Sequence, residues 1–315
     1  MRRSLMGSAL LAATLVAACG QDQGPGAGED AAGPVAIATT TPLGDVLREV
    51  VQCADGEAAT LMSPGDDPHT FAPSSAQVSQ LASAAVVVTN GLGLEEGLSS
   101  AVDNAATDGA HVLEIAPLLD PLPFDSLADD HAHEDDHAHE GGDPHVWLDV
   151  SRMARAAQLM GEELAEVTGK DEYAACGVEV SSSLEEVDEQ VRDILAAVPE
   201  ERRTLVSDHH SFGYFADAYG FDVLGVVIPG GSTDAEPSSR ELAGLVQAIG
   251  EAGVPAIFSN TAVESPLMQA VAAEVGHDVE VVDLYVGSVG PAGSGAETYR
   301  DMMLTNARLI ADALD

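Results

Sequence analysis

The chain has 315 residues, of which 53 are acidic and 12 are basic, giving a formal net charge of −41. A surface this negative repels phosphate backbones and leaves no basic stripe, so nucleic-acid binding is excluded. The charge either concentrates cations around the protein or serves only solubility in a salty or acidic environment. Aromatic residues make up only 4% of the chain, so the core is expected to consist of Val, Leu, Ile and Ala.

Residues 1–18 are predicted to be a lipoprotein signal peptide rather than part of the fold. Two arginines precede an apolar stretch, residues 5–17, that is too short to span a membrane permanently. The sequence VAAC at residues 16–19 resembles the lipidation site of bacterial lipoproteins, which implies a lipid on Cys19; the alternative is an ordinary secretory signal with a chance cysteine. Residues 19–33, rich in Gly, Asp and Pro, are expected to be a flexible tether.

Two further cysteines, Cys53 and Cys176, remain in the predicted mature chain. Outside the cytoplasm such a pair can form a disulfide. The sequence does not show whether they lie close together, so their pairing stays open.

Short apolar runs and helical stretches alternate in the first half of the chain. Strands are expected at residues 34–40, 59–63, 84–91 and 109–117, with helices at 42–52 and 74–84. Strands separated by helices of this length indicate a parallel sheet. Residues 34–148 are therefore interpreted as an N-terminal α/β lobe, which includes a histidine-rich loop at residues 129–142.

Residues 149–200 read as linking helices, because residues 149–169 and 178–198 are strongly helical with no strand between them. Asp149 or Ser151 is the expected N-cap of the first. Alternation resumes in residues 201–315, the predicted C-terminal α/β lobe. Its strands are expected at 203–208, 222–228, 254–260 and 278–286, and its helices at 211–220, 239–253, 266–276 and 297–314.

Three of the ten histidines occupy places where ligands bind in open α/β sheets, beyond the carboxyl ends of the strands. His69 lies in a loop between a strand and its helix, His145 lies just before the linking helices, and His209 directly follows a strand. A single histidine at such a place is most often a surface or capping residue. Three at corresponding places indicate a shared ligand, with metal as the natural candidate.

The motifs around these histidines are DPHTFAPSS at 67–75, DPHVWLD at 143–149 and SDHHSFGYFADAYGF at 207–221. In order and spacing they resemble the three histidine motifs of the metal-binding proteins that serve zinc and manganese ABC importers. The resemblance covers essentially the whole chain after the tether. It implies two lobes joined by a long rigid helix, a metal site in the interlobe cleft, and His69, His145 and His209 as ligands. The neighbouring His210 occupies a position that is not a ligand in the family.

The fourth ligand departs from the family pattern. The family usually supplies an aspartate near the end of the last strand, and counting back from Tyr299 reaches Gly287, which has no side-chain donor. Asp283 is the nearest carboxylate and is the expected fourth ligand. Two alternatives remain: water completes the shell, or Asp283 is a solvent-facing strand residue.

Three imidazoles and one oxygen suit tetrahedral zinc, with nitrogen distances of about 2.0–2.1 Å. Carboxylate-rich shells suit Mn²⁺ better. In the family, a histidine at the third motif accompanies zinc, so His209 favours Zn²⁺ as the transported ion over Mn²⁺. Because ligating imidazoles must be neutral, binding is expected to weaken as the pH falls through about 6.5.

The histidine-rich loop carries His131, His133, His137 and His139 among carboxylates and is too polar to pack into a core. Zinc members of the family often carry such a loop here. We expect it to capture or sense zinc by exchangeable coordination, which raises the effective metal concentration near the cleft. The alternative is a variable insertion that binds metal by chance.

The expected function is binding without catalysis: a monomeric, lipid-anchored extracytoplasmic protein delivers Zn²⁺ to the permease and ATPase subunits of an ABC importer. A manganese-specific member of the same family is one alternative. A zinc-dependent hydrolase is another, because three protein ligands and an open position are also a catalytic arrangement, although neither HExxH nor GxSxG occurs. A third is a surface adhesin stabilised by metal.

Overall fold

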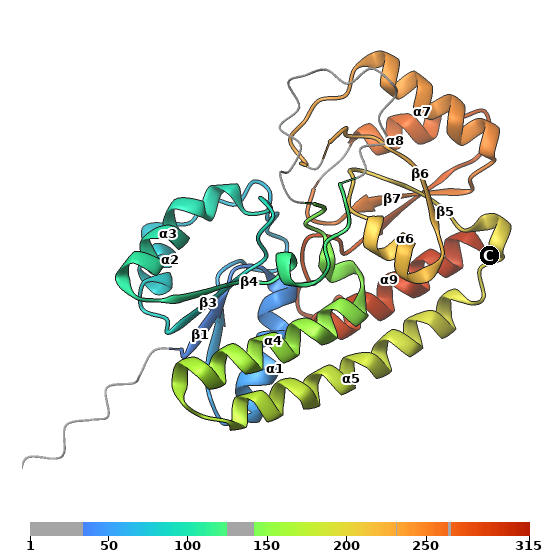
Figure 1. Cartoon of the computed structure of the whole chain (residues 1–315). Coiled ribbons are helices and arrows are strands. Elements are labelled where there is room, and N and C mark those ends of the chain that lie inside the picture. The colour runs from blue at the N-terminus through green and yellow to red at the C-terminus, as the bar shows by residue number, and fades with distance from the viewer. Residues whose placement is uncertain (1–33, 125–141, 231, 264–265) are drawn as a thin grey trace, which may run out of the picture. The chain divides into compact units, whose positions relative to one another are not determined.

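Two parallel sheets organise the computed structural model, which describes residues 34–124, 142–230, 232–263 and 266–315. Cys19, the tether and the histidine-rich loop lie outside these residues. The first sheet has the order β2-β1-β3-β4 and the second the order β6-β5-β7-β8, with every pair parallel. The predicted α/β fold with two parallel-sheet lobes is confirmed (Figure 1).

The strands of the first sheet are β1 (Ala36–Ala38), β2 (Ala58–Thr60), β3 (Val86–Thr89) and β4 (His111–Glu114). Those of the second are β5 (Thr204–Ser207), β6 (Asp222–Val226), β7 (Ala256–Asn260) and β8 (Glu280–Leu284). The α-helices are α1 (Thr41–Cys53), α2 (Ser75–Leu81), α3 (Ser99–Asp108), α4 (Val150–Thr168), α5 (Glu172–Leu195), α6 (Gly213–Tyr219), α7 (Ser239–Ala252), α8 (Pro266–Glu274) and α9 (Tyr299–Leu314). Short 3-10 turns are η1 (Glu96–Leu98), η2 (Ala116–Leu118), η3 (Val146–Leu148) and η4 (Glu200–Arg202).

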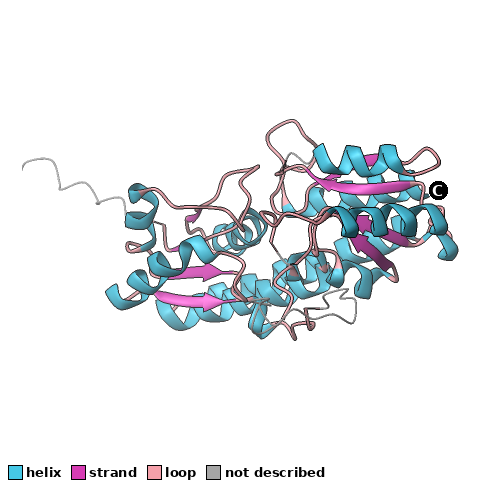
Figure 2. Ribbon diagram, turned by 90° about the horizontal axis from the view of Figure 1, so that it is seen from above, coloured by secondary structure: helices cyan, strands magenta, loops and turns pink. Residues whose placement is uncertain are grey.

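The central strands, β1 and β3 in the first sheet and β5 and β7 in the second, are buried on both faces, because helices cover the two sides to which alternate residues point. The edge strands β4, β6 and β8 keep some exposed residues. In the first sheet, Val86 and Val88 join a core shared with α1, α4 and α5, whereas Val87 joins a separate core beneath α2 and α3. In the second sheet, Phe258 faces the shared core and Ile257 faces α7 and α8. Figure 2 shows the strands in magenta with cyan helices on either side.

The helices α4 and α5 pack directly against each other and form the helical link between the sheets (Figure 1). Glycines make this close approach possible. A Cβ added to Gly161 would lie 2.5 Å from the carbonyl oxygen of Tyr173, and one added to Gly177 would lie 2.7 Å from that of Ala157. The last helix, α9, then returns from the second sheet to pack against α5 and α1. The chain's last element therefore belongs to the framework that joins the lobes.

Local signals account for several helix boundaries. Asp149 is the N-cap of α4 and accepts from the backbone N–H groups of Ser151 and Arg152, which resolves the two expected candidates in favour of Asp149. The helix α3 was not predicted, because Ala101 and Ala105 are the only residues it buries and its apolar periodicity is weak. None of the helices in the described part of the chain is long and apolar enough to cross a membrane.

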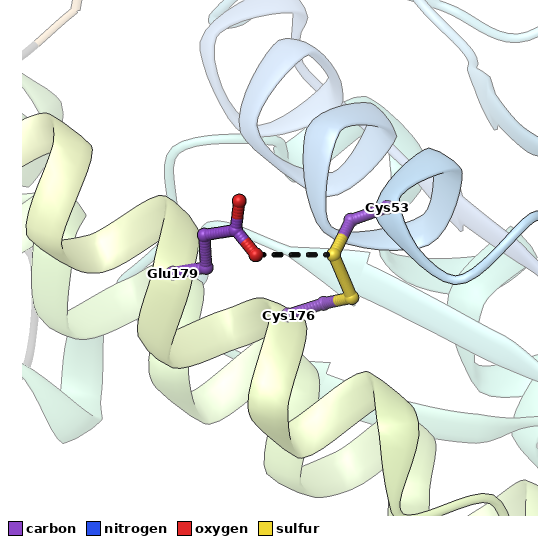
Figure 3. Close-up of a disulfide and its surroundings, with 3 residues drawn as sticks. All are labelled: Cys53, Cys176 and Glu179. Atoms are coloured by element: carbon purple, nitrogen blue, oxygen red, sulfur yellow. Dashed lines mark hydrogen bonds between the residues drawn. A yellow bond between two sulfur atoms is a disulfide. The ribbon is translucent and has the colours of Figure 1, made fainter.

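A disulfide joins Cys53, the last residue of α1, to Cys176 in the first half of α5 (Figure 3). The Cα atoms are 5.8 Å apart, within the usual range for disulfides. A carboxylate oxygen of Glu179 lies 3.9 Å from the Cys53 sulfur, but this is a contact rather than a hydrogen bond, since a disulfide sulfur carries no proton. The bond attaches the first lobe to the linking helices covalently.

Candidate metal centre

Three histidines far apart in sequence converge at the carboxyl ends of the strands. One ring nitrogen from each of His69, His145 and His209 lies within 4.8 Å of the others. The ring centroids are 5.2–5.3 Å apart in all three pairs. His145 and His209 are almost completely buried, whereas His69 is half-buried. The predicted grouping of these three side chains is therefore present.

The orientation of His145 is fixed by Asp143, two residues earlier. The Asp143 carboxylate accepts from the His145 backbone N–H at 2.9 Å and lies 2.7 Å from ring Nδ1. When Nδ1 carries the proton and donates to this carboxylate, the lone pair on Nε2 is available to coordinate a metal ion. Carboxylates behind ligating imidazoles act in this way in many metal sites, setting the tautomer and raising ligand basicity.

His209 repeats this arrangement from the second lobe. Asp208 accepts from its backbone N–H at 2.9 Å, and the same oxygen lies 3.0 Å from ring Nδ1. Burial by itself lowers the pKa of His209, but the charge and hydrogen bond of Asp208 outweigh it and raise the pKa above 6.5, with help from Asp67 and Asp143. A metal ion that binds this ring therefore competes with a proton.

The facing ring nitrogens of His145 and His69 cannot both keep bare lone pairs. His145 Nε2 lies 3.3 Å from His69 Nε2, and two lone pairs at this distance repel unless a proton or a metal ion lies between them. His209 Nε2 is buried and has no hydrogen-bond partner among the described residues. Leaving such an atom unsatisfied costs about 1–3 kcal/mol. The three imidazoles therefore fit a metal ion that accepts one lone pair from each.

The segment that carries His145, residues 143–149, is held by buried polar contacts on several sides. We call it the His145 segment. Tyr214 donates to the Asp143 carbonyl at 2.6 Å and Tyr299 to the Trp147 carbonyl at 2.7 Å. Burial raises the pKa of Tyr214 to about 12, so the hydroxyl remains protonated and donates. Asn90, at the end of β3, donates to the Pro144 carbonyl at 2.8 Å.

Trp147 and its aromatic neighbours were expected to pack around the site rather than to recognise a ligand. The Trp147 ring is buried, lies 5.3 Å from the His145 ring, and donates through Nε1 to the Val286 carbonyl at 2.7 Å. Phe212 and Phe215 are buried in the shared core. These side chains hold His145 against the end of β8.

Asp283 does not join the three histidines, contrary to the expectation of a fourth carboxylate ligand. It is an exposed residue of β8, between Val282 and Leu284, which point into the core. Strand alternation therefore turns Asp283 to solvent. Among the described residues, no Asp, Glu or Cys completes the group.

Gly287, the position reached by counting back from Tyr299, does border the site. A Cβ at this glycine would lie 3.0 Å from Cδ of Pro68, the residue before His69. The position is thus next to the group of three histidines, but it supplies no side-chain donor. A glycine here lets the two backbones approach closely.

Other histidines of the described chain lie elsewhere. His111 is exposed on β4, with Nδ1 3.6 Å from a Glu163 carboxylate oxygen. His210 packs against Phe124, and His277 lies near the Val254 carbonyl. His131, His133, His137 and His139 are outside the described residues. The roles of Asp143 and Asp208 were not predicted, although each lies within a histidine motif, where a carboxylate just before a ligand is a readable signal.

Comparison with known proteins relates this site to metal-binding proteins. The chain matches the family described as "Zinc-uptake complex component A periplasmic" over residues 37–313. It is 31% identical to the manganese-binding lipoprotein MntA of Halalkalibacterium halodurans, over 97% of this chain and 96% of that protein. It is 29% identical to the zinc-binding protein TroA of Treponema pallidum, over 89% of each chain. The solved structure of that periplasmic zinc-binding protein aligns with a TM-score of 0.77, covering 90% of this chain and 99% of that chain.

Proposed function

Because this chain belongs to the family of zinc-uptake complex component A proteins, we propose that it binds Zn²⁺ outside the cytoplasm and delivers it to an ABC importer. The permease and ATPase subunits of that importer are its expected partners. The chain acts by binding and release, without chemical conversion of a substrate. This agrees with the relatives, which are named as binding proteins.

The choice of zinc over manganese is carried by the donor set. The described residues bring together three imidazole nitrogens and no carboxylate oxygen. Imidazole suits zinc, whereas manganese is better served by carboxylate, carbonyl and water oxygens. Two relatives are named for manganese and one for zinc, so the names do not favour zinc, and the proposed selectivity rests on the donor set. Water is the proposed fourth ligand in place of Asp283.

The proposed capture and release of the metal ion depend on which parts of the chain supply the three histidines. His69 belongs to the first lobe, His209 to the second, and His145 to the start of the linking helices. Asp143 and Asp208 hold the proton on Nδ1 of two of the rings, which leaves Nε2 as the donor to metal. An ion bound by all three rings ties the lobes together, and release to the permease requires at least one ring to withdraw.

The test is a competition titration of the purified protein with Zn²⁺ and Mn²⁺ against a chelating indicator. We expect one tight zinc site, and His209→Ala lowers its affinity by more than about a hundredfold, since loss of a ligand exceeds the 10–100-fold effect of losing a supporting group. His111→Ala is the matched control and leaves the affinity unchanged. Manganese binding as tight as zinc binding would overturn the selectivity, and absence of tight binding of either ion would overturn the proposal.

We also propose that the histidine-rich loop, residues 129–142, collects zinc for the cleft through His131, His133, His137 and His139. Deleting residues 131–140 is expected to remove only weak zinc equivalents in calorimetry and to leave the tight one. Loss of the tight equivalent on this deletion would contradict the division of roles.

We propose that the protein is located at the membrane, held there by a lipid on Cys19. More than one acyl chain is needed for stable anchoring. Cys19→Ala is expected to move the protein from the membrane fraction to the soluble extracytoplasmic fraction, and retention of the variant in the membrane would contradict the anchor.

A further inference from the structure

The loop that carries His69, residues 63–70, is attached to the second lobe at two points. We call it the His69 loop. The backbone N–H of Gly65 donates to Ser288 Oγ at 2.8 Å, and Thr233 Oγ1 donates to Asp67 Oδ2 at 2.5 Å. Ser288 follows the end of β8 and Thr233 follows β6, so both partners come from the lobe that also carries His209.

Asp67 links Thr233 of the second lobe to the backbone of His69 through its two carboxylate oxygens. Oδ2 accepts from Thr233, as described, while Oδ1 accepts from the backbone N–H of His69 at 3.1 Å. One side chain therefore connects the backbone of a metal-binding histidine to the opposite lobe. The acceptor is charged, and such hydrogen bonds are about twice as strong as neutral ones.

The Thr233 side of this contact is itself anchored. Thr233 is buried although its neighbour Asp234 is exposed. A few residues later, Ser238 caps α7 by accepting from the Glu241 backbone N–H at 3.2 Å, and Glu241 accepts in return from the Ser238 backbone N–H at 2.6 Å. This capping box fixes the end of the loop to the second lobe.

Building on the proposed function, we propose that Asp67 and Thr233 are positioning residues that hold His69 against the bound metal ion and slow its release. Neither side chain is among the ligating groups. Their hydrogen bond forms only while the His69 loop lies against the second lobe, so it adds to the barrier for withdrawing His69. Once the bond is broken, the His69 loop can withdraw while His145 and His209 stay in place.

The test measures the rate of zinc release from the purified full chain after mixing with excess chelator. Thr233→Val removes the hydroxyl with little change in shape, and we expect release to be faster by about tenfold. Thr233→Ser restores the hydroxyl and returns the rate to near the original. Ser232→Ala, in the same loop, removes a hydrogen bond to Asp234 and is the matched control, with a change of at most about twofold.

A second readout separates positioning from general stability. The melting temperature of the metal-free Thr233→Val protein is expected to lie within about 2 °C of the original. Should Thr233→Val fail to fold, Asp67→Asn replaces it; the neutral acceptor weakens the bond, and release is expected to be faster by about threefold.

Three results would overturn the inference. The first is an unchanged rate of zinc release from Thr233→Val, or from Asp67→Asn if Thr233→Val does not fold. The second is a release rate of Thr233→Ser that stays as fast as that of Thr233→Val. The third is an equal acceleration of release by the control Ser232→Ala. An original protein that binds no metal would instead overturn the proposed function, and this is visible before any variant is compared.

Discussion

The His145 segment and the His69 loop approach the same site, but they are held in different ways. Tyr214, Tyr299 and Asn90 each donate to a backbone carbonyl of the His145 segment, and His145 is completely buried. The His69 loop is partly exposed and reaches the second lobe through the Gly65 and Thr233 hydrogen bonds. His145 is thus held in place by buried partners, whereas His69 lies on a loop with few attachments.

This difference between the two regions indicates how the affinity for the metal ion and the rate of its release can be set separately. Ligands held by buried partners lose little conformational freedom when metal binds, which favours affinity. A loop attached by a few polar bonds can withdraw without disturbing the core, which favours release. Four substitutions, in order of decreasing expected effect, separate a covalent link remote from both regions from the groups that support the His145 segment.

The largest effect is expected from removing the disulfide with Cys53→Ser and Cys176→Ser. The bond closes a long stretch of chain, with a sequence separation of 123, and its loss should lower the free energy of unfolding by about 2–4 kcal/mol. Urea denaturation of the metal-free protein measures this. The zinc affinity should change little, because the bond lies between α1 and α5 and touches neither region. A large loss of affinity would mean that both regions depend on this covalent link.

Asp143→Asn tests the carboxylate that orients His145. The amide keeps the shape of the side chain but weakens the hydrogen bond to Nδ1, and we expect zinc affinity to fall by about 10–100-fold. Competition titration measures the change. Asp66→Asn is the control, because the Asp66 carboxylate accepts from the Ser63 backbone N–H within its own turn of the His69 loop. Equal effects of the two variants would point to general loss of negative charge rather than orientation.

Tyr299→Phe removes one of the donors to the His145 segment. The hydroxyl bonds the Trp147 carbonyl in a buried position, so the free energy of unfolding should fall by about 1–2 kcal/mol. The zinc affinity should fall by only a few-fold, because Tyr214 and Asn90 remain. A loss of zinc affinity as large as that of Asp143→Asn would show that the position of the His145 segment depends on the Tyr299 hydrogen bond alone.

The smallest expected effect is on the pH dependence of stability, through Glu95, which holds the backbone of Asn90. The Glu95 carboxylate accepts from the Asn90 backbone and from Thr39, and burial raises its pKa above 4.5. The folded state therefore binds more protons than the unfolded state between the ordinary and the raised pKa, so stability falls as the pH rises through this interval. Glu95→Gln should flatten this part of the stability profile, measured by melting temperature against pH. An unchanged slope would assign the pH dependence to other groups.

Much of this molecule could be predicted from sequence, for physical reasons that differ by region. The strands carry apolar runs long enough to be buried on both faces, and His69, His145 and His209 follow strand ends or precede a capped helix. Period and position thus indicated the sheets and the three histidines that converge. The family resemblance, by the count back from Tyr299, indicated Gly287 as a position beside them.

Other features depend on contacts that no local pattern encodes. The helix α3 buries only two alanines, so its periodicity is too weak to read. Asp283 is the nearest carboxylate along the chain, but it is an exposed residue of β8 and does not join the three histidines, in agreement with the alternative that it faces solvent. The bond between Asp67 and Thr233 joins residues 166 positions apart, and only the fold brings them together. The pairing of Cys53 with Cys176 is a long-range contact of the same kind.

The return of α9 to the first lobe has a consequence for how the chain acquires its structure. The backbone N–H of Tyr299 donates to Asp45 on α1, and Arg300 pairs with Glu49 on α1 and donates to Ser183 on α5. The apolar face of α1 therefore lacks part of its cover until the final helix has been synthesised. A chain that ends before residue 299 would leave that face of α1 accessible to chaperones, so the core around α1 is complete only once α9 has packed against it.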